Sequence, residues 1–145
     1  QHQPAVVVMA TSAADVVTAV RFARHLDLEI AVQGTGHGIS RSVDGAMLIN
    51  TAQMKSVRVD AETQTAWVEA GMQWGGVLEA AQAVGLAPLL GSSPMVGVVG
   101  YTLGGGMGWL ARKYGLASDN VVSFEVVTAD GEQLTASADE NPELC

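Results

Sequence analysis

The most informative stretch of this sequence is VGVVGYTLGGGMGWL, which runs from Val96 to Leu110. It lies inside a longer segment, residues 80–111, that contains no charged side chain. An uncharged segment of that length raises the question of a membrane span. Its glycines, together with Pro88 and Pro94, would break a helix in lipid repeatedly, and freed backbone groups are not satisfied in hydrocarbon. The pattern therefore predicts an irregular loop that is buried against the rest of the protein or against a ligand.

A second glycine-rich segment, Gln33 to Gly38, directly follows a predicted strand. It is not a P-loop, because no Gly-Lys-Ser/Thr follows, and its glycine spacing differs from that of a Rossmann fingerprint. Glycines allow positive φ angles and bring several N–H groups toward one anion, so both segments suit a phosphate. His37 stands between two glycines, where it is free to face a ligand. Taken alone, however, such a histidine is more often satisfied by local backbone hydrogen bonds, and glycine runs are more often only turns.

Composition and charge limit the class of protein. The 145 residues, of which 48% are hydrophobic and 15% charged, predict one domain or two small subdomains with a packed core. A net charge of −8 argues against a nucleic-acid partner or an anionic membrane surface. The single cysteine, Cys145, allows no intrachain disulfide and no cysteine-based zinc site. Because the first residues also lack the pattern of a signal peptide, we expect a cytoplasmic protein.

The last residues predict a helix that begins and is not continued. Asn141 suits a cap, Pro142 the first helical position, and Glu143 the positive end of the helix dipole. The sequence then stops at Cys145. Because helix nucleation costs more than one turn returns, we expect the sequence to be part of a longer polypeptide.

Periodicity and turn signals predict an α+β fold. Ser12 and Asp15 form a capping-box-like start to a helix that runs to about Leu26. A strand joined to the next by a helix favours parallel pairing, whereas Asp130-Gly131 predicts a hairpin. We place a subdomain break near residues 50–54, which gives subdomain 1 over residues 1–52 and subdomain 2 over residues 53–145. The predicted strands are 5–9, 29–33, 46–50, 56–60, 65–70, 121–129 and 132–136, and a second helix covers 74–84.

Several residues with chemical potential are predicted to be structural. Trp67, Trp74 and Trp109 are expected in the core or at an interface, because an acidic chain is a poor candidate for base stacking. Asp119, beside Asn120, is expected to be a turn or cap residue. Asp139-Glu140 is expected to be a solvated acidic pair, and no metal site is predicted.

In this order, the two glycine-rich segments resemble a known family. The matching motifs cover nearly the whole chain and are specific in combination, although each is weak alone. They are AVQGTGHG (31–38), DG (44–45), VGVVGYTLGGGMGWL (96–110), YGLASDN (114–120), VTADG (127–131) and ENPEL (140–144). Together they are similar to the FAD-binding domain of the berberine bridge enzyme-like flavoproteins, which belong to the vanillyl-alcohol oxidase, or PCMH-type, superfamily.

The resemblance implies a two-subdomain PCMH-type FAD-binding fold. One subdomain is a small three-stranded parallel sheet with helices, the other a larger, mainly antiparallel sheet with helices, and FAD extends between them. The loop 34–38 would bind the pyrophosphate through backbone N–H groups, and segment 97–108 would line the dinucleotide. Asn120 and the backbone of Val126 would lie toward the adenosine end. The implied cofactor-binding residues are Gln33, Gly34, Thr35, Gly36, His37, Gly38, Pro94, Gly97, Val98, Gly100, Tyr101, Gly104, Gly105, Gly108, Asn120 and Val126.

His37 matches the family position whose imidazole is bonded to the 8α-methyl of the flavin. The resemblance therefore implies FAD held covalently through His37. Bicovalent members have a cysteine just before the proline that is Pro94 here, whereas this chain has Ser93, so the resemblance implies at most one link. Val98 matches a position associated in plant members with access of O2 to the flavin, which favours an oxidase over a dehydrogenase.

The resemblance implies an FAD-linked oxidoreductase. Such an enzyme would oxidise an alcohol, amine, sugar or secondary metabolite by hydride transfer to the flavin, with O2 as the expected acceptor. Its catalytic base and substrate pocket are expected on a substrate domain absent from these 145 residues, so no catalytic residue is assigned and this part alone is expected to be inactive. The expected partners are FAD, a small-molecule substrate and the rest of the polypeptide.

Two alternatives remain open. The first is a flavin-retaining or drug-sequestering binding protein of the same fold that performs no turnover. The second is a domain that binds no flavin, in which the glycines serve only turns and close packing.

Overall fold

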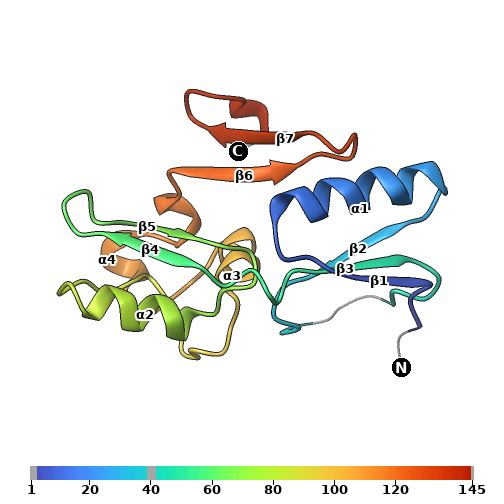
Figure 1. The fold of residues 1–145 in the computed structure, drawn as a ribbon. Coiled ribbons are helices and arrows are strands. Elements are labelled where there is room, and N and C mark those ends of the chain that lie inside the picture. Colours follow the sequence, from blue (N-terminus) through green and yellow to red (C-terminus); the bar gives the residue numbers. More distant parts are fainter. Residues whose placement is uncertain (1–2, 39–41, 145) are drawn as a thin grey trace. The chain divides into compact units, whose positions relative to one another are not determined.

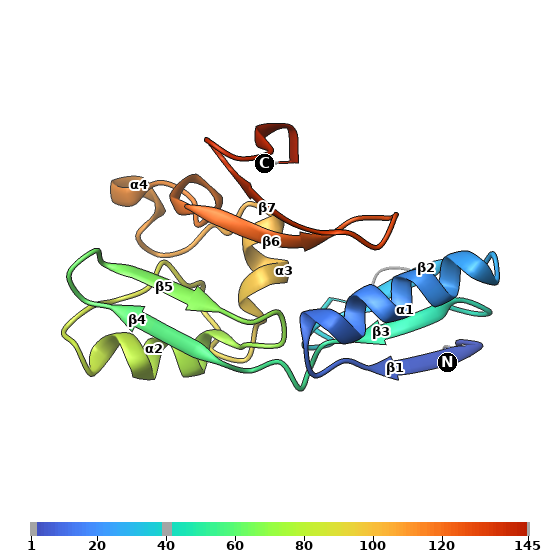
Figure 2. The same cartoon turned by 45° about the horizontal axis from the view of Figure 1, so that its top comes forward.

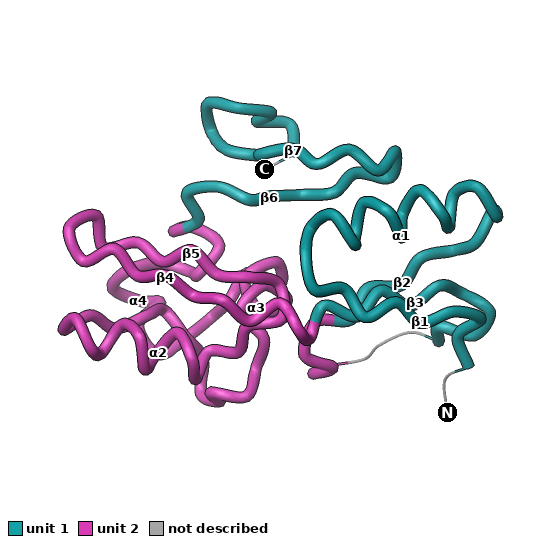
Figure 3. Tube along the Cα trace, in the orientation of Figure 1, with its two compact units in different colours: residues 1–33, 39–51, 121–145 teal, residues 34–38, 52–120 magenta. Residues whose placement is uncertain are grey.

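The computed structural model describes residues 3–38 and 42–144 of the chain (Figure 1). Predictions that concern Gln1, His2 and Cys145 lie outside the described residues. The chain divides into two compact units, coloured separately in Figure 3. Unit 1 comprises the described parts of residues 1–33, 39–51 and 121–145, and unit 2 comprises residues 34–38 and 52–120.

This division shares one boundary, near residue 52, with the predicted subdomains 1–52 and 53–145, but the units are not contiguous in sequence. Residues 34–38 belong to unit 2, and residues from 121 onward belong to unit 1. The second difference has a physical reason, because the strand that starts at Ser123 contacts the first helix of unit 1.

Unit 1 contains the predicted parallel sheet. Strands β1 (Val6–Met9), β2 (Ile30–Gln33) and β3 (Met47–Asn50) pair in the order β1-β3-β2, and both pairings are parallel. Helix α1 (Ala13–His25) lies along one face of this sheet in Figure 2. The parallel arrangement is confirmed, and the crossover from β1 to β2 through α1 leaves space for β3 between them.

Helix α1 begins as the sequence predicts. The backbone N–H of Asp15 donates to Ser12 Oγ at 3.2 Å, and the N–H of Ser12 donates to Asp15 Oδ2 at 3.1 Å. This capping box is complete, and it satisfies donors that a helix start leaves unpaired.

The core of unit 1 lies between α1 and the sheet. Met47 and Ile49 alternate along the central strand, and both side chains are fully buried. Ala19, Val20 and Ala23 are the buried residues of α1. Small side chains on the helix let its backbone approach the sheet closely, which accounts for the complete burial of the larger side chains on β3.

An antiparallel hairpin completes unit 1. Strands β6 (Ser123–Val127) and β7 (Gln133–Ser137) pair through the predicted turn at Asp130-Gly131, so this hairpin is confirmed. Ala136 of β7 is fully buried. At the turn, the Arg24 guanidinium of α1 forms an ion pair with Asp130. The short 3-10 helix η2 (Pro142–Leu144) follows the hairpin.

Unit 2 is built from a second hairpin and several helices. Strands β4 (Val57–Asp60) and β5 (Thr65–Val68) pair antiparallel, as predicted. Met72, Trp74, Val77 and Val98 form its buried core cluster. The helices are α2 (Trp74–Gln82), α3 (Val98–Leu103), α4 (Ala111–Tyr114) and the 3-10 helix η1 (Ser118–Asn120). The α+β class is therefore confirmed, with the antiparallel strands in two separate two-stranded sheets.

Three predictions of local structure are corrected. The uncharged segment is not wholly irregular, because Val98 to Leu103 forms α3, which buries Val98 and Thr102. For Trp109, for which the core or an interface was predicted, the core of unit 2 is excluded, since its side chain is 80% exposed. Asn141 does not cap a helix: its φ is 47°, and its side-chain amide donates to the carbonyl of Thr135 at 2.7 Å. Among the described residues, no helix is both long and apolar enough to cross a membrane.

Candidate functional site

The start of α2 holds the beginning of the uncharged, glycine-rich segment around residues 94–97 in place. Gln73, the N-cap of α2, makes no side-chain capping bond. Instead, the N–H of Trp74 donates to the carbonyl of Val96 at 3.0 Å, and the N–H of Gly75 donates to that of Pro94 at 2.9 Å. Backbone carbonyls of the segment thus satisfy the donors that every helix start leaves free. In the structure, the contribution of Pro94 is therefore its backbone carbonyl, which accepts the N–H of Gly75.

Gly97 is the point where the two glycine-rich segments touch. A Cβ at residue 97 would lie 2.8 Å from Oγ1 and 2.9 Å from Cγ2 of Thr35. Next to it, the N–H of Val98 donates to the carbonyl of Met72 at 2.9 Å. Because real Cβ atoms essentially never approach so closely, only glycine permits this contact. Residues 34–38 and 97 belong to the same compact unit, although 59 residues or more separate them in sequence.

The backbone donors of the loop 34–38 have no partner among the residues that the structure describes. Gly36 and Gly38 have φ angles of 78° and 77°. Within the described ranges 3–38 and 42–144, no N–H group of residues 34–38 donates to another residue. A Cβ at Gly38 would meet no atom within 4 Å, so space surrounds this turn. Free N–H groups in an open turn with positive φ angles are suited to an anion.

His37 is exposed at the tip of this loop. Its imidazole forms no hydrogen bond to any residue that the structure describes. The local hydrogen bonds that would make it a structural histidine are therefore not seen among those residues. The side chain is available to a ligand from outside the chain.

Helix α3 offers an open glycine face. A Cβ at Gly100 would meet nothing within 4 Å, and Gly100 is exposed. Gly104, the C-cap residue, is also exposed, and Gly105 has a φ of 95°. Val98 points the other way, into the core. The predicted residues of α3 thus divide into an open side and a buried side.

Two predicted site residues have a structural explanation. The ring of Tyr101 packs against the core cluster, edge-on to Trp74 with ring centroids 5.5 Å apart. A Cβ at Gly108 would lie 2.3 Å from the carbonyl oxygen of Leu90 and 3.0 Å from the hydroxyl of Tyr101. Close packing accounts for this glycine. Burial raises the pKa of the Tyr101 hydroxyl, which has no hydrogen-bond partner among the described residues.

Asn120 closes the loop between α4 and η1. Its side-chain amide donates to the carbonyls of Tyr114 at 2.9 Å and Leu116 at 2.8 Å. Asp119 accepts a hydrogen bond from the N–H of Leu116 at 2.8 Å, which confirms its prediction as a turn residue. Both side chains therefore hold this loop.

The remaining predicted residues, Gln33 and Val126, belong to unit 1. Gln33 ends β2, and its carbonyl accepts the N–H of Thr51 at 2.9 Å. Val126 pairs with Leu134 in the hairpin. Thr51 was not predicted: its side chain is 4% exposed and its hydroxyl has no partner among the described residues. Its position directly after the predicted strand 46–50 is the feature of the sequence that could have pointed to it.

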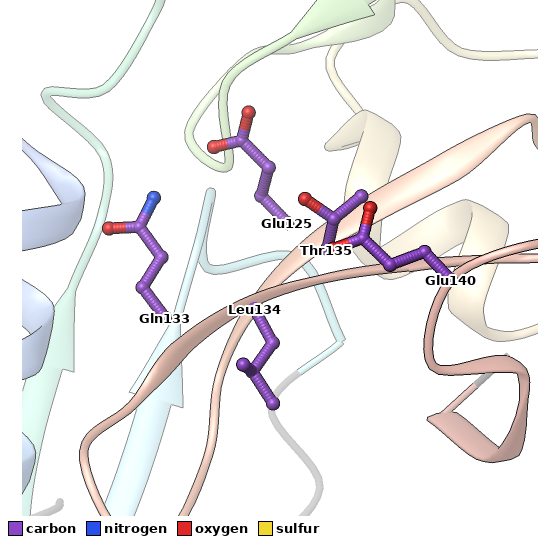
Figure 4. A pocket seen from close by; sticks show the side chains of 5 residues that line it. All are labelled: Glu125, Gln133, Leu134, Thr135 and Glu140. Carbon is purple, nitrogen blue, oxygen red and sulfur yellow. The ribbon is translucent and has the colours of Figure 1, made fainter.

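A shallow polar pocket lies on the β6–β7 hairpin. It is lined by Glu125, Gln133, Leu134, Thr135 and Glu140. In Figure 4 the Leu134 side chain extends away from those of Glu125 and Gln133, as strand alternation requires. Over residues 3–38 and 42–144, no group of three or more His, Cys, Asp or Glu side chains is placed to hold a metal ion. The pocket carries two carboxylates and no further chemistry.

Comparison with known proteins gives a family match that includes both glycine-rich segments. The FAD binding domain family model matches residues 4–137. The chain is 38% identical to (R)-6-hydroxynicotine oxidase of Paenarthrobacter nicotinovorans, covering 99% of this chain and 32% of that protein. It is 37% identical to berberine bridge enzyme-like D-1 of Nicotiana tabacum, covering 94% of this chain and 25% of that protein. The chain thus spans between a quarter and a third of these relatives.

Solved structures agree. The crystal structure of 6-hydroxy-D-nicotine oxidase from Arthrobacter nicotinovorans matches with a TM-score of 0.92 and 38% identity, covering 99% of this chain and 32% of that one. Phl p 4, a grass pollen allergen with glucose dehydrogenase activity, matches with a TM-score of 0.87 and 31% identity, covering 93% and 29%. A Phl p 4 variant in which one isoleucine is replaced by valine is a glucose oxidase. The family match and these relatives show that the chain belongs to the FAD-binding domain family of FAD-linked oxidoreductases, in the vanillyl-alcohol oxidase, or PCMH-type, superfamily that includes the berberine bridge enzyme-like proteins.

Proposed function

We propose that this chain is the FAD-binding part of an enzyme that oxidises an organic substrate and passes the electrons to O2. The substrate class is an alcohol, amine, sugar or secondary metabolite. The observation that carries the proposal is the contact of Thr35 with Gly97, which joins the loop 34–38 to the α3 segment within one unit. When bound, FAD supplies the two-electron acceptor for the reaction.

The residues of unit 2 fit this cofactor. The N–H groups of the loop 34–38, which have no partner among the described residues, are suited to the diphosphate. Gly38 and Gly100 leave room where side chains would project. The protein has a net charge of −8, so it must hold a phosphate through backbone dipoles rather than through a basic patch. These groups bind and orient the cofactor.

His37 is the proposed covalent tether. Its imidazole is exposed, lies on the loop assigned to the diphosphate, and bonds to no described residue. A neutral imidazole nitrogen is a nucleophile, so the residue type suits a covalent bond to a cofactor. Such a bond would retain FAD and raise its reduction potential.

Val98 supports O2 as the final acceptor. Its side chain is buried at the start of α3, on the side of the helix that faces the core. In Phl p 4 the replacement of one isoleucine by valine accompanies a change from a glucose dehydrogenase to a glucose oxidase. The resemblance places Val98 at a family position associated with access of O2 to the flavin, and we carry that role over to Val98. We assign the catalytic base to the rest of the polypeptide, and a cytoplasmic location remains our expectation.

The decisive experiment uses acid precipitation of the purified full-length protein. The visible spectrum is recorded before trichloroacetic acid is added, and the pellet and supernatant are then compared for yellow colour. We expect colour in the pellet of the wild type and in the supernatant of His37→Ala. His25→Ala is the matched control, because His25 is an exposed histidine on α1, and its colour should stay in the pellet.

The other outcomes are equally informative. Colour in the wild-type supernatant would keep FAD as cofactor and exclude the tether. A colourless protein that stays colourless after incubation with FAD would contradict the proposed function as a whole. Anaerobic addition of candidate substrates then tests turnover, because a substrate must bleach the flavin absorbance and O2 must restore it.

A further inference from the structure

The ring of Tyr101 is enclosed by glycines that come from two separate stretches of unit 2. A Cβ at Gly91 would lie 3.0 Å from Cε2 of the ring, and a Cβ at Gly106 would lie 2.8 Å from Cε1. At the tip, a Cβ at Gly108 would lie 3.0 Å from the hydroxyl oxygen. The ring therefore has backbone against both edges and against its tip, at distances that only glycine allows without a shift of the neighbouring atoms.

The core of unit 2 fixes the ring itself. Tyr101 belongs to α3 and packs against the buried core cluster, with an angle of 87° between its ring plane and that of Trp74. Trp74 begins α2 and is 6% exposed. Because the ring is anchored by a helix and by a buried neighbour, the glycine backbone takes its path from the ring.

The hydroxyl group of Tyr101 takes no part in this arrangement. Its oxygen is buried away from solvent and has no hydrogen-bond partner among the described residues. A group that solvent does not reach is also out of reach of a bound cofactor. The contribution of Tyr101 to the site is therefore the shape of its ring.

The backbone held against the ring includes the glycine turn 104–108. Gly105 and Gly106 have φ angles of 95° and 74°. The carbonyl of Gly105 accepts the N–H of Ser118, and the carbonyl of Gly106 accepts that of Ala117, each at 3.0 Å. The N–H groups of the last three residues of the turn donate to no residue that the structure describes. A turn with engaged carbonyls and consecutive free N–H groups is suited to an anion.

We propose that Tyr101 is a positioning residue for the cofactor: its ring, and not its hydroxyl, holds the turn 104–108 so that the free N–H groups face FAD. The inference rests on the proposed function, because it concerns the same cofactor. A mobile glycine turn would lose conformational entropy each time FAD binds, whereas a turn packed on a fixed ring has already lost it. The ring therefore raises FAD affinity by ordering the backbone donors in advance.

Three variants of the full-length protein test the role of the ring. All are made in a His37→Ala background, so that FAD binds reversibly and can be titrated. Tyr101→Phe keeps the ring and should bind FAD within about two-fold of the parent, because the lost hydroxyl has no partner among the described residues. Tyr101→Leu removes the ring and should weaken binding by about ten-fold or more, because the donors are no longer ordered in advance. Tyr114→Leu is the matched control, since Tyr114 is a half-exposed tyrosine of the same unit, and it should bind FAD like the parent.

Hydrogen exchange of the flavin-free variants separates this positioning from general stability. The amide protons of Ala117 and Ser118 should exchange several-fold faster in Tyr101→Leu than in Tyr101→Phe, because their acceptors are carbonyls of the turn. The amides of the β4–β5 hairpin should exchange at the same rate in both variants. Should Tyr101→Leu fail to fold, Tyr101→Met takes its place, since methionine fills irregular space without a rigid ring.

The contrary results are equally definite. An equal loss of FAD affinity in Tyr101→Phe and Tyr101→Leu would assign the effect to the hydroxyl and overturn the proposal. Unchanged affinity in Tyr101→Leu, or weaker affinity without faster exchange at Ala117 and Ser118, would overturn it as well. A parent protein that binds no FAD would refute the proposed function, and the exchange rates would still decide whether the ring holds the turn.

Discussion

The side chain of Thr35 stands directly over Gly97, so that a Cβ at residue 97 would overlap its hydroxyl and methyl groups at 2.8 and 2.9 Å. Gly97→Ala must therefore push the loop 34–38 away from α3. We expect a loss of about 1–3 kcal/mol in the free energy of unfolding, typical of overpacking, together with a lower FAD content. Urea unfolding and the ratio of flavin to protein absorbance measure the two effects. Unchanged flavin content would show that this contact does not position the loop.

Gly100→Ala separates cofactor binding from stability. The position is helical and a Cβ there meets nothing within 4 Å, so the apoprotein should gain up to about 1 kcal/mol from helix propensity. If FAD lies against this open face, as we propose, the same methyl group should weaken FAD binding. Urea unfolding of the apoprotein and FAD titration of refolded protein give the two readings. Equal affinity for FAD in variant and wild type would contradict the assignment of Gly100.

Tyr101→Phe removes a buried hydroxyl that has no partner among the described residues. Because an unpaired buried polar group is costly, the variant should be at least as stable as the wild type, by up to about 1 kcal/mol. Loss of more than about 1 kcal/mol would show that the hydroxyl has a partner after all, the cofactor among the candidates.

We also expect Tyr101 to make the free energy of unfolding depend on pH in the alkaline range. Burial raises the pKa of Tyr101 above the ordinary value of 10.0, so the native state keeps its proton where the unfolded state loses it. Its contribution to stability is thus complete below pH 10 and lost as pH rises through the folded pKa. Ultraviolet titration of the wild type should therefore show a tyrosine that ionises late, above the ordinary pKa of the side chain. In Tyr101→Phe this late step must be missing.

We expect Asp15 to make the free energy of unfolding depend on pH in the acid range, with the opposite sign. Hydrogen bonds from the Thr11 hydroxyl and N–H, and from Ser12, hold the pKa of this carboxyl below its ordinary value of 3.8. Its stabilising effect is therefore present above the unfolded pKa and lost as pH falls through the folded pKa. Urea midpoints of Asp15→Asn should depend less on pH in this acid range than those of the wild type. Asp139→Asn, at an exposed carboxylate, serves as the control.

Much of the fold could be predicted because local signals agree with tertiary structure. The Ser12 and Asp15 capping box, the Asp130-Gly131 turn and the valine-rich strands each depend on residues close in sequence. The grouping of the hairpin with unit 1 could not be predicted, because it depends on packing against α1 and on the ion pair of Arg24 with Asp130. Such contacts leave no local pattern.

The candidate site shows the same division. Both glycine-rich segments and His37 were evident from the sequence, since glycine punctuation and an isolated imidazole are visible in one dimension. The role of each individual glycine was not evident from the sequence. Gly97 admits Thr35 and Gly108 admits the Leu90 carbonyl, whereas Gly100 faces open space. Only the three-dimensional surroundings distinguish a glycine required for packing from one that leaves room for a ligand.

The start of α2 is closed by carbonyls of Pro94 and Val96 instead of a side-chain cap. Fraying of that helix and release of the segment before α3 are consequently a single opening event. The amide protons of Trp74 and Gly75 therefore report on the segment before α3. They exchange with deuterium only when their hydrogen bonds to the carbonyls of Val96 and Pro94 break. Slower exchange at these two amides on adding FAD would register cofactor binding from the far side of the segment, without any label.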